Sequence, residues 1–145
     1  MTERSIVHGT FTIERSYAVP PARAFKAWAD PAIKAKWFGA GASEVFDFRE
    51  GGREYASGAM DEKTTFTFEV RYYDIVPDNR IVYTYEMAMN GARLSVSVAT
   101  VEFRAEGKGT KLVLHEDGAF LDGLDTVDQR RQGTEMLLNQ LGTVL

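Results

Sequence analysis

The sequence predicts an α+β fold in which a curved antiparallel sheet of about six to seven strands wraps around one long C-terminal helix. Three observations support this fold class. Most of the chain alternates apolar and polar residues with a period of two, which indicates strands. Short turns separate these segments, so consecutive strands must be antiparallel. The last segment changes to a helical period and carries the apolar stripe that can cover one face of the sheet.

The first predicted strand covers Val7–Val19, where β-branched and aromatic residues alternate with polar ones. The pair Pro20–Pro21 ends this strand, and proline suits the first turn of a helix because its missing N–H has no intrahelical partner there. A short helix is therefore predicted over Ala22–Ala29. Asp30–Pro31 supplies the cap of a second short helix that reaches Trp37.

The period of two then returns and continues through most of the chain. Strands are predicted at Glu44–Phe48, Arg53–Ser57, Thr64–Val76, Arg80–Met89, Leu94–Phe103 and Thr110–Glu116. Gly51–Gly52 and Asn90–Gly91 provide turns in which a positive φ costs little, and the second pair is the strongest hairpin signal in the chain.

The final predicted element is an amphipathic helix over Val127–Leu145. Its stripe consists of residues at helical spacing: Thr134, Leu137, Leu138, Leu141 and Leu145. The acidic run Asp117–Asp128 is expected to be a loop leading into this helix, with Phe120 and Leu121 forming a lid or a subunit contact.

Composition narrows the class of protein. The 145 residues predict one domain over 1–145, able to bury a core. The absence of cysteine excludes a disulfide framework and a cysteine nucleophile. A net charge of −4 argues against nucleic-acid binding through a basic face. No apolar run is long enough to insert into a membrane, and no hydrophobic signal region is visible, so a cytoplasmic location is expected. No metal-ligand spacing occurs, and no cofactor is expected.

Several stretches carry a resemblance to a known family. They are "VPPARAFKAWADPAIKAKWFG" (Val19–Gly39), "DFREGGRE" (Asp47–Glu54), "DIVPDNRIVYTYEM" (Asp74–Met87), "GTKLVLHEDGAFLDG" (Gly109–Gly123) and "RQGTEMLLNQLG" (Arg131–Gly142). The chain resembles the Aha1-type branch (activator of heat-shock chaperone ATPase, C-terminal-domain-like) of the SRPBCC/START-like superfamily, in a bacterial subgroup of unassigned function. It departs from the Gly-Trp pair frequent in that family, because it has Gly133–Thr134.

The resemblance implies a helix-grip fold with a cavity between the sheet and the C-terminal helix. Family members bind apolar molecules there, so the partner expected here is a small hydrophobic or aromatic molecule. The expected ligand contacts are aromatic and inward-facing residues of the strands and helices: Trp37, Phe66, Phe68, Tyr83, Tyr85, Met87, Glu116, Arg131, Thr134 and Leu138. For the aromatic residues among them, plain core filling is the alternative.

Glu116 is in phase with Leu112 and Leu114, so its carboxylate is expected to point toward the helix. Arg130 or Arg131 is the expected partner, in an arrangement that either holds strand to helix or acts on a bound molecule. His115 has the opposite parity and is expected to face solvent or a partner subunit, while His8 is expected to lie in a disordered chain end.

Three classes of function therefore stay open at this point. The first is noncatalytic binding of the apolar molecule, with no catalytic residue assigned. The second is an enzyme of the same fold, a cyclase, dehydratase or hydrolase acting through Glu116, a tyrosine or an arginine. The third is a partner-binding module related to chaperone regulation. Apolar residues on both faces of Leu94–Phe103 also predict either a bulge or a homodimer packed through the outer face of the sheet.

Overall fold

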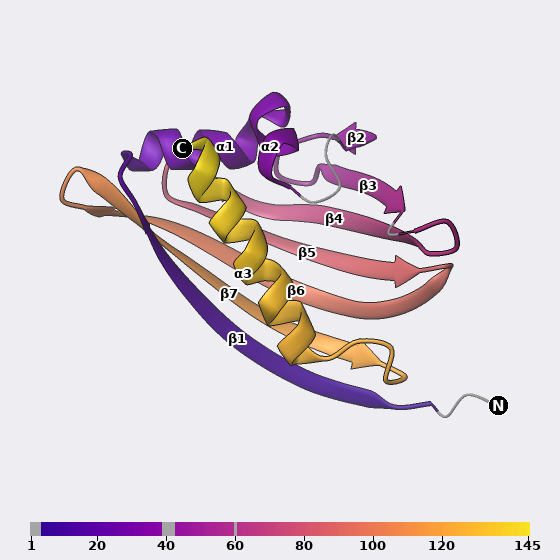
Figure 1. Cartoon of the computed structure of the whole chain (residues 1–145). Coiled ribbons are helices and arrows are strands. Elements are labelled where there is room, and N and C mark those ends of the chain that lie inside the picture. The colour runs from indigo at the N-terminus through magenta and orange to yellow at the C-terminus, as the bar shows by residue number, and fades with distance from the viewer. Residues whose placement is uncertain (1–3, 39–42, 60) are drawn as a thin grey trace.

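The computed structural model describes residues 4–38, 43–59 and 61–145 and contains one antiparallel sheet gripping a long helix (Figure 1). The strands are β1 (Ile6–Tyr17), β2 (Val45–Phe46), β3 (Arg53–Ala59), β4 (Thr65–Val76), β5 (Arg80–Met89), β6 (Ala92–Glu106) and β7 (Gly109–Leu121). Their order across the sheet is β1-β7-β6-β5-β4-β3-β2, and every neighbouring pair is antiparallel. The helices are α1 (Pro21–Ala29), α2 (Pro31–Trp37) and α3 (Val127–Val144). The predicted helix-grip fold class is confirmed.

The chain enters the sheet through β1 and continues into the two short helices α1 and α2. In β1, Phe11 and Ile13 point inward and are buried, while Thr10 and Thr12 lie on the other face. Pro21 occupies the first turn of α1. A carboxylate oxygen of Asp30 then accepts the backbone N–H of Ala32 at 2.9 Å and caps α2, as the sequence predicted.

The last strand is longer than the sequence predicted, because Asp117–Leu121 continues β7 and is not a loop. This stretch lies between β1 and β6, where Gly118 pairs with Gly9 on one side and Ser97 on the other. Backbone hydrogen bonding on both edges outweighs the weak strand propensity of an Asp-Gly-Ala stretch. Phe120 is consequently an inward-facing core residue, 2% exposed, and not part of a lid.

Two other expectations are corrected or resolved nearby. His8 lies within β1, paired with Ala119, and not in a disordered end. A bulge accounts for part of the apolar pattern in β6: the register to β5 shifts between Met87 and Ala88, which leaves Leu94 unpaired, and Leu94 is buried. Val96 and Val98 are exposed on the outer face, and the homodimer through that face stays a prediction.

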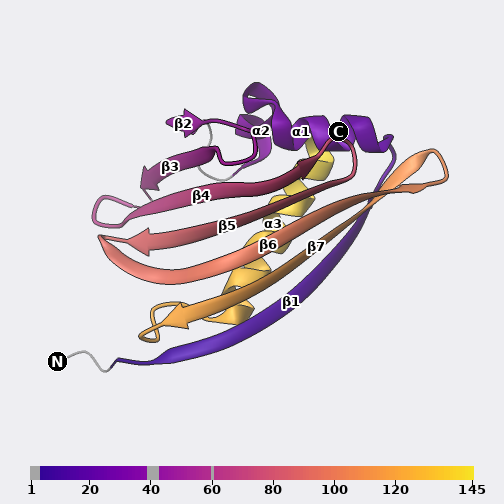
Figure 2. The same cartoon turned by 180° about the vertical axis from the view of Figure 1, so that it is seen from behind.

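Helix α3 crosses the concave face of the sheet diagonally, and none of the helices in the described residues covers the opposite face (Figures 1 and 2). The C-terminal half of α3 is packed down on the core through Leu138 and Leu141, which are 1% and 0% exposed. The Tyr17 hydroxyl donates to the Leu138 carbonyl at 2.7 Å and fixes β1 to this half. Near the middle of α3, Met136 is 71% exposed, whereas Arg130 in the N-terminal part of the helix is 7% exposed and reaches Tyr85 and Ser95 of the sheet. No helix in the described residues is long and apolar enough to cross a membrane.

Candidate functional site

A cavity of about 720 Å³ lies between the N-terminal half of α3 and the concave face of the sheet. Aromatic side chains from both short helices and from two strands form much of its wall: Trp28, Trp37, Phe38, Phe66, Phe68, Tyr83 and Tyr85. The wall is completed by aliphatic and polar residues of the strands, the β7–α3 loop and α3: Met87, Met89, Leu94, Leu114, Glu116, Leu124, Asp125, Gln129, Arg130, Gln132, Gly133, Thr134, Met136, Leu137 and Leu138. Exposed Leu124 and Met136 mark its opening between the β7–α3 loop and α3.

The strand hairpin β4–β5 places its aromatic residues in the cavity by simple alternation. Phe66 pairs with Met89 and Phe68 pairs with Met87, so four large side chains cover one patch of the inner face. The polar residues between them, such as Thr67 and Glu69, point to the other side of the sheet. The pattern of period two in the sequence therefore translates directly into an apolar wall.

The ten residues expected to contact a ligand all line the cavity, with the exception of Arg131. Arg131 lies on the exposed side of α3, where its Nε is 3.0 Å from Glu135 Oε1, one helical turn later. Its neighbour Arg130 takes the inward position instead. The sequence left open which arginine meets Glu116, and the helical phase of α3 selects Arg130.

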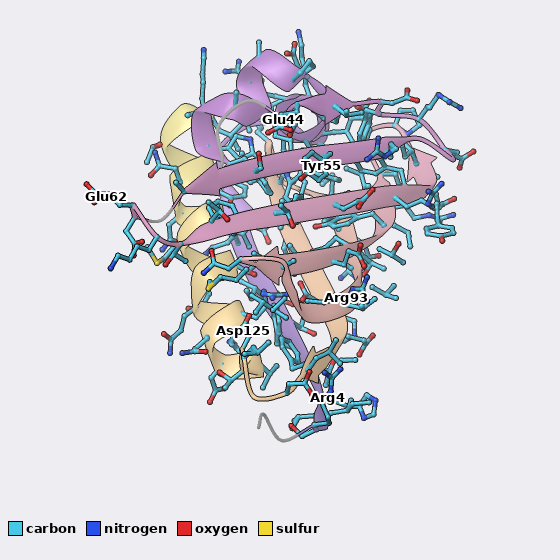
Figure 3. The ribbon with its side chains drawn as sticks, turned by 90° about the vertical axis from the view of Figure 1, so that its right-hand side faces the viewer. Arg4, Glu44, Tyr55, Glu62, Arg93 and Asp125 are labelled. Carbon is cyan, nitrogen blue, oxygen red and sulfur yellow. The ribbon has the colours of Figure 1, made fainter. Side chains whose placement is uncertain are left out.

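Glu116 is the centre of a buried polar cluster at one end of the cavity. Its two carboxylate oxygens lie 2.8 and 2.7 Å from the Tyr85 hydroxyl, which donates to them. The same hydroxyl accepts a hydrogen bond from Arg130 Nη1 at 3.0 Å, and this nitrogen lies 3.6 Å from Glu116 Oε2. Arg130 Nη2 donates to Ser95 Oγ at 2.7 Å and to Asp125 Oδ2 at 2.8 Å. Figure 3 shows Asp125 beside the end of α3 that begins after the β7–α3 loop.

Burial dominates the electrostatics of this cluster. Glu116 is 2% exposed, and its desolvation raises the pKa of the carboxyl above the usual range, although Tyr85 and Arg130 act in the opposite direction. Desolvation also raises the pKa of the Tyr83 hydroxyl well above 10, and the charges of Tyr85, Glu116 and Glu54 act in the same direction. Both tyrosines are consequently neutral hydroxyl groups at the cavity wall at any pH near neutrality.

The Tyr83 hydroxyl of the wall makes no hydrogen bond to any residue that the structure describes, although Tyr85 on the same strand makes several. The Trp28 indole N–H is also unpaired among the described residues, but it is enclosed by the surrounding packing and does not face the open cavity. Chemically, the cavity combines an apolar surface with a few polar groups at one end, which is the usual composition of a small-molecule site.

A second buried polar cluster was not predicted from the sequence. Lys34 of α2 lies 2.6 Å from Glu54 Oε1 of β3, and the Tyr72 hydroxyl of β4 donates to the same oxygen at 2.6 Å. Ser43 donates to the other oxygen of Glu54 at 2.6 Å. Desolvation lowers the pKa of Lys34, although Glu54 opposes this effect. None of these residues lines the cavity, so the cluster fixes α2 to the sheet behind the aromatic wall.

Sequence reasoning also missed several residues of the cavity wall. Trp28 is not among the ligand contacts expected from the sequence, and Asp125 falls within the acidic run expected to be a loop, yet both line the cavity. Asp125 precedes Arg130 by five residues and lies before the start of α3, so the usual helical spacings of three or four residues do not indicate this ion pair. His115 lies on the outer face, as expected, where its ring nitrogens meet Thr12 at 2.7 Å and Asp117 at 3.1 Å.

Comparisons with known proteins agree with this architecture. A protein from Rhizobium leguminosarum of known structure is 41% identical, with a TM-score of 0.93 over 99% of this chain and 97% of that one. The Mll3558 protein from Rhizobium loti is 43% identical, with a TM-score of 0.91 over 97% of this chain and 99% of that one. CalU16 from Micromonospora echinospora, at 22% identity, shares the fold, with a TM-score of 0.68 over 99% of this chain and 85% of that one. A search of the curated proteins finds no match.

Residues 18–145 match the family model described as activator of Hsp90 ATPase homolog 1-like protein, which covers most of the chain. Together with the helix-grip architecture, this match confirms the family resemblance identified in the sequence. The chain belongs to the activator of Hsp90 ATPase homolog 1-like family, within the SRPBCC-type group of helix-grip proteins.

Proposed function

We propose that the protein binds a small hydrophobic or aromatic molecule in the cavity beneath α3. The observation that carries this proposal is the aromatic wall around about 720 Å³ of space. This volume lies within the range of about 300 to 1,000 Å³ found for small-molecule sites. In a domain stabilised only by its core, the same aromatic side chains would be expected to fill this space, because protein interiors leave few voids larger than a water molecule.

The Tyr83 hydroxyl supports the same proposal. It belongs to a residue of the cavity wall and makes no hydrogen bond to any residue that the structure describes, so it offers a polar point of contact. Such a group fixes the orientation of a molecule that binds mainly through its apolar surface.

Filling the cavity from the protein side tests the proposal. Thr134 lines the cavity and is half-buried, so Thr134→Trp places an indole in the ligand space. We expect Nile red, an uncharged apolar dye, to become fluorescent with the wild-type protein and to bind at least about tenfold more weakly to Thr134→Trp. Gln140→Trp is the matched control, because Gln140 is exposed on the packed half of α3 and does not line the cavity. Equal dye binding by all three proteins would contradict the proposal.

A second candidate function is a reaction on the same class of molecule. The observation that favours it is the position of Glu116 at the cavity wall, where burial raises the pKa of its carboxyl, because such a carboxyl can act as a general acid or base. Glu116→Gln keeps the shape of the side chain and removes its proton transfer. Retained binding with lost turnover of a bound molecule supports catalysis, whereas unchanged chemistry in this variant contradicts a role of Glu116 in it.

A further inference from the structure

The polar end of the cavity contains an arginine, which usually indicates an anionic ligand. We propose instead that the occupant is an uncharged molecule with a hydroxyl or phenol group directed at Glu116 and Tyr83, and that the cavity excludes organic anions. This proposal rests on the proposed binding function and specifies the chemistry of the ligand.

The first argument is that the guanidinium of Arg130 is already occupied by the protein. Nη2 donates to both Ser95 and Asp125, and Nη1 donates to Tyr85 and lies near Glu116. The charged group also lies over the ring of Phe120, 5.4 Å from its centroid, and its side chain is only 7% exposed. A ligand carboxylate would have to displace one of these partners to form the paired hydrogen bonds that make arginine an anion receptor.

The second argument is the balance of charge. Among the described residues that line the cavity, the ionisable acids and bases are Arg130, Glu116 and Asp125. One positive charge therefore faces two carboxyl groups, and the sum is zero when Glu116 is protonated and negative when it is ionised. The start of α3 adds a partial positive charge, but Asp125 and Asp128 already lie there, and Thr126 accepts the Gln129 N–H. An anion thus finds no net attraction at this end.

The third argument is that the groups still able to bind are those that suit a neutral hydroxyl. Glu116 accepts hydrogen bonds in its ionised form, and the Tyr83 hydroxyl can donate or accept. A ligand hydroxyl satisfies both without bringing a new charge into a poorly solvated space. A ligand carboxylate next to Glu116 would place like charges together, which disfavours the charged forms of both.

A pair of ligands that differ only in this group tests the proposal. We choose 4-phenylphenol and biphenyl-4-carboxylate, measured by isothermal titration calorimetry against the full chain at pH 7. We expect the phenol to bind at least about tenfold more tightly than the carboxylate. The variant Asp125→Asn removes the negative charge beside Arg130 and weakens the hydrogen bond between this position and the guanidinium. We expect this variant to gain carboxylate affinity about fivefold or more, while phenol affinity changes less than about twofold.

Asp128→Asn is the matched control, because it removes the same charge from an exposed position at the same end of α3 without touching Arg130. Carboxylate binding equal to or tighter than phenol binding in the wild type would overturn the proposal and leave the binding function intact. An equal gain in Asp128→Asn would also overturn it, since the effect would then be one of net charge. Failure of the phenol to bind a protein that takes up Nile red counts against the proposal alone, whereas failure of Nile red as well removes the binding function.

Discussion

The Tyr85 hydroxyl of β5 lies within hydrogen-bond distance of both carboxylate oxygens of Glu116 on β7, at 2.8 and 2.7 Å. Strand β6 separates the two strands, and its Ser97 pairs with Tyr85 on one side and with Gly118 on the other. The contact therefore crosses a whole strand on the concave face, which the curvature of the sheet favours. It brings an acid, a phenol and the guanidinium of Arg130 together at the end of an apolar cavity.

Removing the hydroxyl of this pair is expected to destabilise the fold. Tyr85→Phe leaves Glu116 and Arg130 without their shared partner in a buried site. We expect the free energy of unfolding to fall by about 1 to 3 kcal/mol, measured by urea denaturation. Tyr73→Phe removes the same atom from an outward-facing, 58% exposed tyrosine and should change stability by less than about 0.5 kcal/mol. Equal effects of the two variants would contradict the assigned hydrogen bonding.

Glu116 is also expected to make stability depend on pH. Its pKa is raised in the folded state, so above the ordinary value of 4.5 the unfolded chain ionises while the folded protein still holds the proton. The folded state then binds more protons, and stability must fall as the pH rises through this window. Glu116→Gln lacks this titration. We expect the stability of the wild type, relative to Glu116→Gln, to decrease upward from about pH 4.5 in urea melts. A difference that is flat or rises with pH would contradict the direction of the shift.

The buried pair of Lys34 and Glu54 provides a prediction about the wall behind the cavity. Lys34→Met leaves the carboxylate of Glu54 buried without its cation, which costs about 3 to 5 kcal/mol. The double variant Lys34→Met/Glu54→Gln removes both charges and should recover part of this loss. Urea denaturation of both single variants and the double variant measures the coupling, and strictly additive losses would contradict the pairing.

Gly133 in the middle of α3 is expected to tolerate a side chain. A Cβ at this position meets no atom within 4 Å, so Gly133→Ala should stabilise the protein by about 1 kcal/mol through helix propensity alone. Nile red binding should stay within about twofold, because a methyl group takes little of the cavity. Gly9→Ala is the contrast: its Cβ would lie 2.6 Å from the Val127 side chain at the start of α3, so this variant should destabilise the fold. Thermal melts of both variants measure whether the melting temperature rises for Gly133→Ala and falls for Gly9→Ala.

The elements of the fold were largely predictable because each has a strong local signal. The alternation in β4 and β5, the proline in the first turn of α1, the Asp30 cap of α2 and the stripe of α3 are all visible in short stretches of sequence. The end of β7 was not predictable in this way, since Asp117–Leu121 is a strand only because β1 and β6 flank it. Pairing with segments distant in the sequence, and not local propensity, determines the conformation of this stretch.

The candidate site was predictable for its apolar part and less so for its polar part. Phe66, Phe68 and Met87 follow from strand parity alone. The choice between Arg130 and Arg131 depends on the rotation of α3 about its axis, which the sequence sets only to within a residue. The cluster of Lys34, Glu54 and Tyr72 joins three elements distant in the chain, and no spacing in the sequence predicts it.

Helix α3 packs on the core through Leu138 and Leu141 and lies over the cavity in its middle turns, which has a consequence for how such a protein can diversify. Leu138 and Leu141 secure the helix, while the turns around Gly133 and Met136 face the ligand space and carry little of the core. Substitutions in these turns can therefore change which molecule the cavity binds with little loss of folding stability. One helix thus carries the residues that hold the fold together and, at separate positions, residues that can vary with the bound molecule.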